Sequence, residues 1–343
     1  MSREFLILFP DFFSFVGEEK RNGSNFAHSY ESVFTSFFSY SGPYKGYERE
    51  LLDVFGFKEE RNSVQSSLVN ILAANDLEGS EENIILRADP VYLKADQNRV
   101  FLFDGQTLAI DKEEAEEILG ELNDLYSEES FYFTMGEKPW RWYLRESEYH
   151  PPEGDSPLTL RGFPLEVAET ERQNMGELKT LLTEVQMILH ASRINEARAG
   201  RNGPPINSLW FWGYKKSPRN FSDKARKSSL ITNCDLARNI ASYMKMENWI
   251  DLETFNESGF DHVKSDGLVI IDPTELEIQK SFSEKILINL FAQITAGTLR
   301  RVRLITRLGH FKVSPFSRLK FWKRRVAFSE IKNRQSELGG QLF

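Results

Sequence analysis

The densest run of polar and aromatic side chains in this sequence lies at 188–218. It reads ILHASRINEARAGRNGPPINSLWFWGYKKSP, so arginines and asparagines surround a Gly-Pro turn that precedes a tryptophan-rich segment. Closely spaced Arg and Asn side chains can clamp an anionic or sugar-like ligand, because they present several directed hydrogen-bond donors. Helix capping and core tryptophans are the alternative interpretation. From this run we select as ligand-binding candidates Asn195, Arg198, Asn207 and Trp212.

A second polar run, ILRADPVYLKADQNRVFLFD, occupies 85–104. Its Arg87 and Asp89 could orient a ligand, and we add both to the binding candidates. The alternative is that Asp89-Pro90 forms an ordinary turn and that Arg87 pairs with a carboxylate.

Polar residues that directly follow apolar runs form a third group. Asp11 follows EFLILF, Asp272 follows GLVII, and Arg307 with His310 follows RVRLIT. Ligands of parallel α/β sheets bind at the carboxyl ends of the strands, so Asp11, Asp272 and His310 could coordinate Mn²⁺ or Zn²⁺. Three ligands are few for a two-metal site. We therefore assign no catalytic residue and no metal ligand, and expect no cofactor, with Mn²⁺ or Zn²⁺ as the alternative.

Several familiar site signatures are missing from the sequence. There is no GxGxxG, no Walker-type glycine-lysine loop, no GxSxG and no HExxH. The lone cysteine, Cys234, excludes an intramolecular disulfide framework and a Cys-rich zinc site. Because no His is near it in sequence, we interpret Cys234 as a residue of a helix start rather than as a nucleophile.

The elements that position these residues follow from periodicity. Residues 81–145 read as short strands around an acidic helix, which a capping box of Asp111 and Glu114 opens. Apolar runs then alternate with helical patterns, which is typical of a parallel sheet covered by helices. The runs predicted as strands are 207–212, 228–232, 267–272 and 301–306; the predicted helices are 170–191, 234–245 and 281–296.

We therefore predict an α/β fold, in which a mostly parallel sheet flanked by helices carries an inserted α+β subdomain. Its expected parts are the N-terminal half of the core at 1–80, the subdomain and a proline-rich linker at 81–165, the C-terminal half of the core with a basic tail at 166–328, and a frayed C-terminus at 329–343.

Charge is unevenly distributed along the chain. The net charge is −8, yet residues 299–328 hold ten Lys and Arg and no Asp or Glu. Within them, 315–328 mixes aromatic and basic residues and could contact an anionic membrane surface, or its aromatics could dock on the body of the protein. Nucleic acid is not an expected partner. No apolar window is long enough for a membrane span and no signal peptide is evident, so we expect a cytoplasmic protein.

Four segments resemble a known family: LRADPVYLKAD (86–96), FLFD (101–104), EVQMILH (184–190) and PPINSLWFWG (204–213). They are similar to a group of bacterial phosphoglycerate mutase-like proteins, the RpfE-type regulatory proteins. The order of His190, Asn, Arg and Asn before WFWG is more distantly similar to archaeal-type cofactor-independent phosphoglycerate mutases. The resemblance spans about 83–325.

The resemblance implies an alkaline phosphatase-like core. It also implies two metal ions, a Ser nucleophile and Asp and His ligands in active members. Asp11 matches the acid that ends the first strand, whereas Arg307 stands where an acid is expected, which leaves His310 as a remnant of the last ligand pair. Ser24 and Ser39 are the candidate nucleophiles.

Together these features predict a degenerate, non-catalytic phosphoglycerate mutase-like protein, or pseudoenzyme. It would bind a small anionic or phosphorylated ligand, or a protein partner, in a regulatory role. One alternative is a metal-dependent cofactor-independent phosphoglycerate mutase or phosphohydrolase. The other is a peripheral membrane or nucleic-acid adaptor that acts through the basic C-terminal segment.

Overall fold

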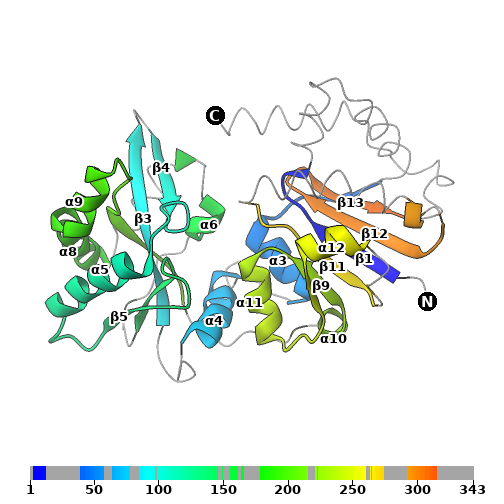
Figure 1. Ribbon diagram of the computed structural model, residues 1–343, viewed down its shortest axis with the longest axis horizontal. Helices are drawn as coiled ribbons and strands as arrows, with labels where there is room; N and C mark the ends of the chain where they lie inside the picture. The colour runs from blue at the N-terminus through cyan, green and yellow to red at the C-terminus, as the bar shows by residue number, and fades with distance from the viewer. Residues whose placement is uncertain are drawn as a thin grey trace. The chain divides into compact units, whose positions relative to one another are not determined.

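The chain divides into two compact units (Figure 1). Unit 1 combines Met1–Lys58 with Asn220–Gln341, and unit 2 spans Glu59–Arg219. The computed structural model describes residues 3–12, 39–57, 64–77, 85–96, 99–145, 149, 155–160, 164–165, 178–214, 221, 223–259, 263, 265–273, 292–294 and 296–314.

Unit 1 is built on a seven-stranded sheet of order β10-β9-β11-β1-β12-β13-β2. The five strands from β10 to β12 are parallel, and β13 and β2 complete the sheet in antiparallel orientation. This mostly parallel sheet confirms the predicted α/β class. The strands are β1 (Arg3–Leu8), β2 (Ser39–Gly42), β9 (Ser229–Thr232), β10 (Trp249–Asp251), β11 (Gly267–Ile270), β12 (Leu299–Thr306) and β13 (Gly309–Val313).

The apolar residues of β1 are buried toward both faces of this sheet, because successive side chains of a strand point to opposite sides. Phe5 and Ile7 belong to a buried cluster that includes Leu252 and Phe255 of α12. A second helix, α3, packs against β1, and α11 packs against β9. The described helices of unit 1 are α3 (Tyr47–Phe55), α10 (Asp223–Arg226), α11 (Asp235–Tyr243) and α12 (Leu252–Ser258).

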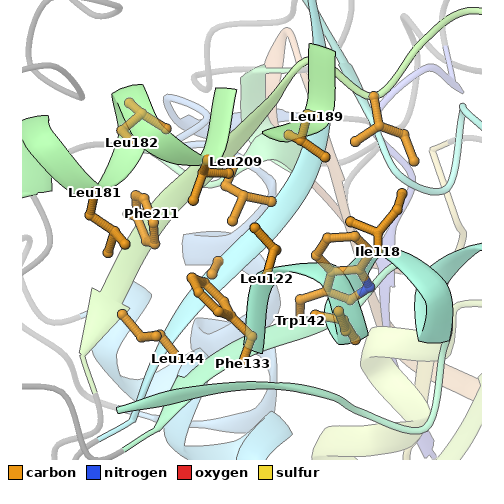
Figure 2. Close-up of a cluster of buried hydrophobic side chains, with 14 of the residues drawn as sticks. Ile118, Leu122, Phe133, Trp142, Leu144, Leu181, Leu182, Leu189, Leu209 and Phe211 are labelled. Atoms are coloured by element: carbon orange, nitrogen blue, oxygen red, sulfur yellow. The ribbon is translucent and has the colours of Figure 1, made fainter. Parts of the chain in front are cut away.

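Unit 2 is an α+β unit with an antiparallel sheet, in which β3 pairs with β4, β6 and β8. Helices α5 and α8 bury their apolar stripes against it, as Figure 2 shows for Ile118, Leu181 and Phe211. The capping box of Asp111 and Glu114 opens α5 as predicted. The elements are α4 (Val64–Asp76), β3 (Ile85–Asp96), β4 (Arg99–Asp104), α5 (Lys112–Leu125), β5 (Tyr132–Met135), β6 (Trp142–Arg145), α6 (Pro157–Leu160), β7 (Pro164–Leu165), α8 (Leu178–Ala191), α9 (Arg193–Gly200) and β8 (Ser208–Tyr214).

The division between the units differs from the boundaries expected from sequence. The tryptophan-rich strand β8 lies in unit 2, whereas the sequence placed it in the C-terminal half of the core. The reason is a long-range pairing, because β8 lies antiparallel to β3 along Leu86–Val91. Helix α4 likewise belongs to unit 2 and packs against β3 and β8.

The turn predicted at Asp89-Pro90 is absent, because β3 runs through both residues as one strand of 12 residues. Pro90 lies where the partner of β3 changes from β6, which pairs with Ile85–Arg87, to β4, which pairs with Val91–Asp96. On that edge of β3, Pro90 falls in the gap between two ladders, where strands tolerate a proline that lacks an N–H. On the other edge, the pairing with β8 continues through Pro90, which lies opposite Leu209.

Several predicted features lie outside the described residues. They are Ser24, most of the helix expected at 281–296, the basic aromatic segment 315–328 and the terminus 329–343. Among the helices that the structure describes, none combines the length and the apolar character that crossing a bilayer requires.

Candidate functional site

The carboxyl-terminal edge of the unit 1 sheet gathers polar side chains from four adjacent parallel strands. Asp11 lies beyond the end of β1, Asn233 follows β9, Asp272 lies beyond β11, and Arg307 follows β12. The carboxyl ends of parallel strands lie at the same edge of a sheet, so the structure places these residues at one edge, as predicted. His310 reaches it differently, because it lies on the antiparallel strand β13.

Asp11 and Arg307 form an ion pair at this edge. Arg307 Nε donates to Asp11 Oδ1 at 2.7 Å, and Arg307 Nη2 lies 3.5 Å from Asp11 Oδ2. The backbone N–H of Arg307 also donates to the carbonyl of Pro10 at 2.9 Å, which fixes the arginine beside the end of β1. The strand-end carboxylate therefore faces a guanidinium of the same chain.

His310 lies against Glu50, a residue of the first turn of α3. The distance from His310 Nε2 to Glu50 Oε1 is 2.7 Å, and the same oxygen accepts the backbone N–H of Lys45 at 2.9 Å. Glu50 is fully buried, and its Oε2 atom has no hydrogen-bond partner among the residues that the structure describes. Glu50 was not among the residues selected from the sequence; the available signal was its place in a helix's first turn, where the macrodipole favours acids.

The end of β9 meets α3 through a buried thiol and phenol. Cys234 Sγ lies 3.1 Å from the Tyr47 hydroxyl, and Asn233 Oδ1 accepts the backbone N–H of Asp272 at 3.1 Å. Burial, with a smaller contribution from the charge of nearby Asp272, raises the pKa of Cys234 to about 12. A protonated, buried thiol is a poor nucleophile, which agrees with the structural role predicted for Cys234.

The phenol of Tyr44 lies within electrostatic reach of Arg307, Asp11 and Glu50. Burial raises its pKa well above the ordinary value, Arg307 opposes the rise, and the two carboxylates add to it. The described titratable side chains of this edge include the acids Asp11, Glu50 and Asp272 and the bases Arg307 and His310.

The described residues of this edge do not fit the two-metal chemistry that the resemblance implies. Asp11 is paired with Arg307, and His310 offers Nε2 to a carboxylate rather than to a metal ion. Within the described ranges, no group of three or more His, Cys, Asp or Glu side chains is arranged to hold a metal. Of the candidate nucleophiles, Ser39 donates to the carbonyl of Lys312 at 3.4 Å.

The six ligand-binding candidates all lie in unit 2, where the structure separates them into three groups. The first group is Arg87, Asp89 and Trp212, which meet on the neighbouring strands β3 and β8. Asp89 Oδ1 accepts from Arg87 Nε at 3.0 Å, and Asp89 Oδ2 accepts from Trp212 Nε1 at 2.7 Å. Burial raises the pKa of Asp89, and the ion pair with Arg87 opposes this.

Tyr143 and Asp76 extend this first group. The Arg87 guanidinium lies over the Tyr143 ring, 4.8 Å from its centroid, and the Tyr143 hydroxyl donates to Asp76 Oδ2 at 2.6 Å. All three candidates of the group are less than 7% exposed. Their polar groups serve one another, so they stabilise the sheet rather than face a ligand.

Arg198 forms the second group with Glu114 of the capping box. Arg198 Nη2 donates to Glu114 Oε2 at 2.6 Å, and Nη1 donates to the carbonyls of Leu108 and Pro204. Arg201 also pairs with Glu114. With 2% of its surface exposed, Arg198 ties α9 to the start of α5.

Asn195 and Asn207 form the third group and hold backbone segments in place. Asn195 Oδ1 accepts the N–H of Ile206, and its Nδ2 donates to the carbonyls of Leu189 and Ile206. Asn207 pairs in the same two-sided way with the N–H and carbonyl of Leu93.

Both asparagines also line a cavity of about 470 Å³. That volume lies in the range typical of small-molecule sites. The other side chains at this cavity include Gln186 and His190, which lie on α8, and Ser208. His190 belongs to the polar run at 188–218 but was not among the ligand-binding candidates selected from the sequence, and neither was Gln186.

No family model and no curated protein matches this chain. Among solved structures it is similar to the cofactor-independent phosphoglycerate mutase from Thermoplasma acidophilum DSM 1728, with 13% identity over 98% of this chain and 99% of that one and a TM-score of 0.44. It is also similar to the PH0037 protein from Pyrococcus horikoshii, with 13% identity over 92% of this chain and 88% of that one and a TM-score of 0.45. Membership of the RpfE-type group stays a prediction.

Proposed function

We propose that this chain is a non-catalytic, phosphoglycerate mutase-like protein that binds a small polar ligand in the unit 2 cavity and so acts as a regulatory protein. The observation that carries the proposal is the cavity of about 470 Å³ at Asn195 and Asn207. Both asparagines were selected from the sequence for ligand binding, and both belong to the segments that resemble the mutase family.

The state of the strand edge in unit 1 supports the non-catalytic part of the proposal. Phosphoryl transfer on two metal ions needs several carboxylates and imidazoles turned toward the ions. Here Asp11 is held by Arg307, and His310 is held by Glu50. These pairs occupy the groups that such a reaction would use.

The cavity itself has the composition of a binding site for a small polar molecule. Leu93, Leu189 and Pro205 supply apolar surface, and Gln186 presents an amide whose Nε2 donates to Ser208 Oγ at 3.0 Å. Binding sites typically combine an apolar lining with a few placed polar groups. Because Asn195 and Asn207 hold the surrounding backbone, the walls are pre-organised.

His190 is the side chain through which an anionic ligand could be held in this cavity. Among the described residues that line the cavity it alone has a side chain that can be cationic, and it is exposed. Arg87 and Arg198, from which an anion contact was expected, are buried and paired with carboxylates. We therefore expect an anionic ligand to contact His190.

The test is calorimetric titration of the full chain with 3-phosphoglycerate. We expect a loss of about tenfold or more in His190→Ala, since a hydrogen bond to a charged group contributes about 1.5 kcal/mol or more. Lys179→Ala, on the exposed side of the same helix, is the matched control and should leave the affinity unchanged. Equal affinity in wild type and His190→Ala would contradict the assignment, as would no binding of millimolar ligand.

A metal-dependent mutase or phosphohydrolase is the second candidate, favoured by the placement of Asp11 and Asp272 at one strand edge with His310 beside it. Elemental analysis after incubation with Mn²⁺ or Zn²⁺ and desalting distinguishes the two. About two equivalents per chain, lost together with turnover of phosphoglycerate in Asp11→Asn, would support the enzyme. A content far below one equivalent would count against it.

A further inference from the structure

A second cavity lies in unit 1, at the edge of the sheet opposite to the one that holds Asp11. Its volume is about 180 Å³, and it opens where the parallel strands β1, β11 and β12 begin. The end of α3 and the short helix α10 form its remaining walls, through Val54 and Lys224 among others. None of the residues discussed for the proposed function lines this cavity.

The strand register gathers basic side chains on this face of the sheet. Glu4 of β1 is directly paired with Arg301 of β12, and two residues on, Leu6 is paired with Arg303. Arg303 is in turn directly opposite Lys312 of β13. Directly paired residues share a face, so Arg301, Arg303 and Lys312 project to the same side.

Carboxylates neutralise only part of this charge. Glu4 Oε1 lies 3.6 Å from Arg301 Nη1 and 4.0 Å from Arg300 Nε, and Glu4 Oε2 lies 3.4 Å from Lys224 Nζ. Asp266 Oδ2 lies 3.4 Å from the same Lys224 nitrogen. These separations are longer than those of well-formed charge-assisted hydrogen bonds. A third acid of the lining, Asp53, is paired elsewhere, with Lys45 at 2.7 Å and Arg49 at 3.5 Å. Among the described residues of the lining, Glu4 and Asp266 therefore face three cations, which are Lys224, Arg301 and Arg303.

Arg303 is the cation at this cavity that has no ion pair in the described part of the chain. Burial lowers its pKa, Glu4 raises it, and neighbouring Arg301 lowers it again, so its surroundings disfavour the positive charge. An arginine nevertheless keeps its proton in proteins. The cavity wall thus presents a planar guanidinium whose charge is uncompensated, beside two like charges.

We propose that this cavity binds a small oxyanion, either free phosphate or the phosphoryl group of a small ester, with Arg303 as the principal contact and Arg301 and Lys224 as supporting charges. The guanidinium matches the geometry of phosphate oxygens and can bind two of them at once. A volume of about 180 Å³ suits a phosphoryl group with a short substituent. The proposal is independent of the ligand assigned to unit 2.

The test is calorimetric titration of the full chain with inorganic phosphate and, separately, with glycerol phosphate at low ionic strength, where screening is weak. We expect Arg303→Gln to weaken binding about tenfold, because hydrogen bonds to charged groups contribute about 1.5 kcal/mol or more. Arg99→Gln removes the same charge from an exposed site in unit 2 and should leave the affinity unchanged.

For Glu4→Gln we expect the opposite change in the affinity for phosphate. Removing the carboxylate that partly neutralises the cavity should tighten phosphate binding several-fold. Tighter binding of glycerol phosphate than of phosphate would identify an ester as the ligand, and the reverse order would identify the free ion. Equal affinities for Arg303→Gln and Arg99→Gln would overturn the proposal, as would absence of phosphate binding by the wild type or weaker binding by Glu4→Gln.

Discussion

Arg307 donates to Asp11 at 2.7 Å across 296 residues of sequence, and this contact closes the carboxyl end of β1 against the end of β12. The pair places the guanidinium of Arg307 against the carboxylate of Asp11 at the end of β1. Both side chains are part-exposed, at 33% for Arg307 and 20% for Asp11, so the pair contributes little to stability and acts chiefly on local charge.

Removal of this internal cation should make the edge more attractive to divalent ions. In Arg307→Gln, Asp11 loses its partner while Glu50 and Asp272 remain nearby. We expect Mn²⁺ to bind roughly fivefold more tightly than to wild type, which corresponds to about 1 kcal/mol of lost repulsion. Titration of Mn²⁺ followed by electron paramagnetic resonance measures the change. Arg99→Gln, at an exposed site of unit 2, is the control, and equal affinities in the two variants would contradict this account.

Arg198 should matter for folding rather than for ligand contact. Arg198→Met leaves Glu114 buried with one partner fewer, and loss of one member of a buried pair typically costs about 3–5 kcal/mol. Urea unfolding should show this loss, and Lys179→Met should show almost none. If Arg198→Met retained the stability of the wild type, the pair would have no structural role. The double variant with Glu114→Met should recover part of the loss.

Gly136 is required by the packing of Asp76. A methyl group at Gly136 would overlap the Asp76 carboxylate, which accepts from Tyr143. Gly136→Ala should therefore lower the free energy of unfolding by about 1–3 kcal/mol, as overpacking does elsewhere. Gly120→Ala is the matched control, since a methyl group there meets nothing. Equal stability of the two variants would show that the Asp76 side chain moves aside freely.

Cys234 should resist alkylation in the folded protein. Burial raises its pKa to about 12, so only about one thiol in ten thousand is ionised near pH 8. Iodoacetamide labelling followed by mass spectrometry should be slow in buffer and fast in concentrated urea. Rapid labelling of the folded chain would mean that the Tyr47–Cys234 contact opens readily.

Stability should fall in alkaline solution. Burial raises the pKa of Tyr44, Tyr47 and Tyr143 above the ordinary value of about 10. At pH values above 10 the unfolded chain then binds fewer protons than the folded one, so stability present below pH 10 is lost as the pH rises. The free energy of unfolding measured across this range should decline. The tyrosinate absorbance of these three residues should appear in the folded protein only well above pH 10, and ionisation of all tyrosines near pH 10 in the folded state would contradict the burial.

The sequence by itself determined the features that depend on neighbouring residues. The capping box of Asp111 and Glu114 was readable because its partners are three residues apart on one helix turn. The buried strand β1 could be predicted because a short apolar run that ends at Pro10 is typical of a buried strand. Strand–helix alternation then indicated the parallel sheet, and with it the edge where Asp11 and Asp272 lie.

Only the tertiary structure decided which partner each polar residue has. Arg198 and Asn195 were selected from the sequence as ligand-binding residues, but the sequence could not show that Arg198 binds Glu114, 84 residues away. The run of β3 through Pro90 likewise depends on β8, which pairs with it from far along the chain. A side chain's type states how many hydrogen bonds it needs, whereas folding decides whether the protein or a ligand supplies them. For Arg198 the protein supplies them, whereas none of the residues that the structure describes supplies one to Arg303.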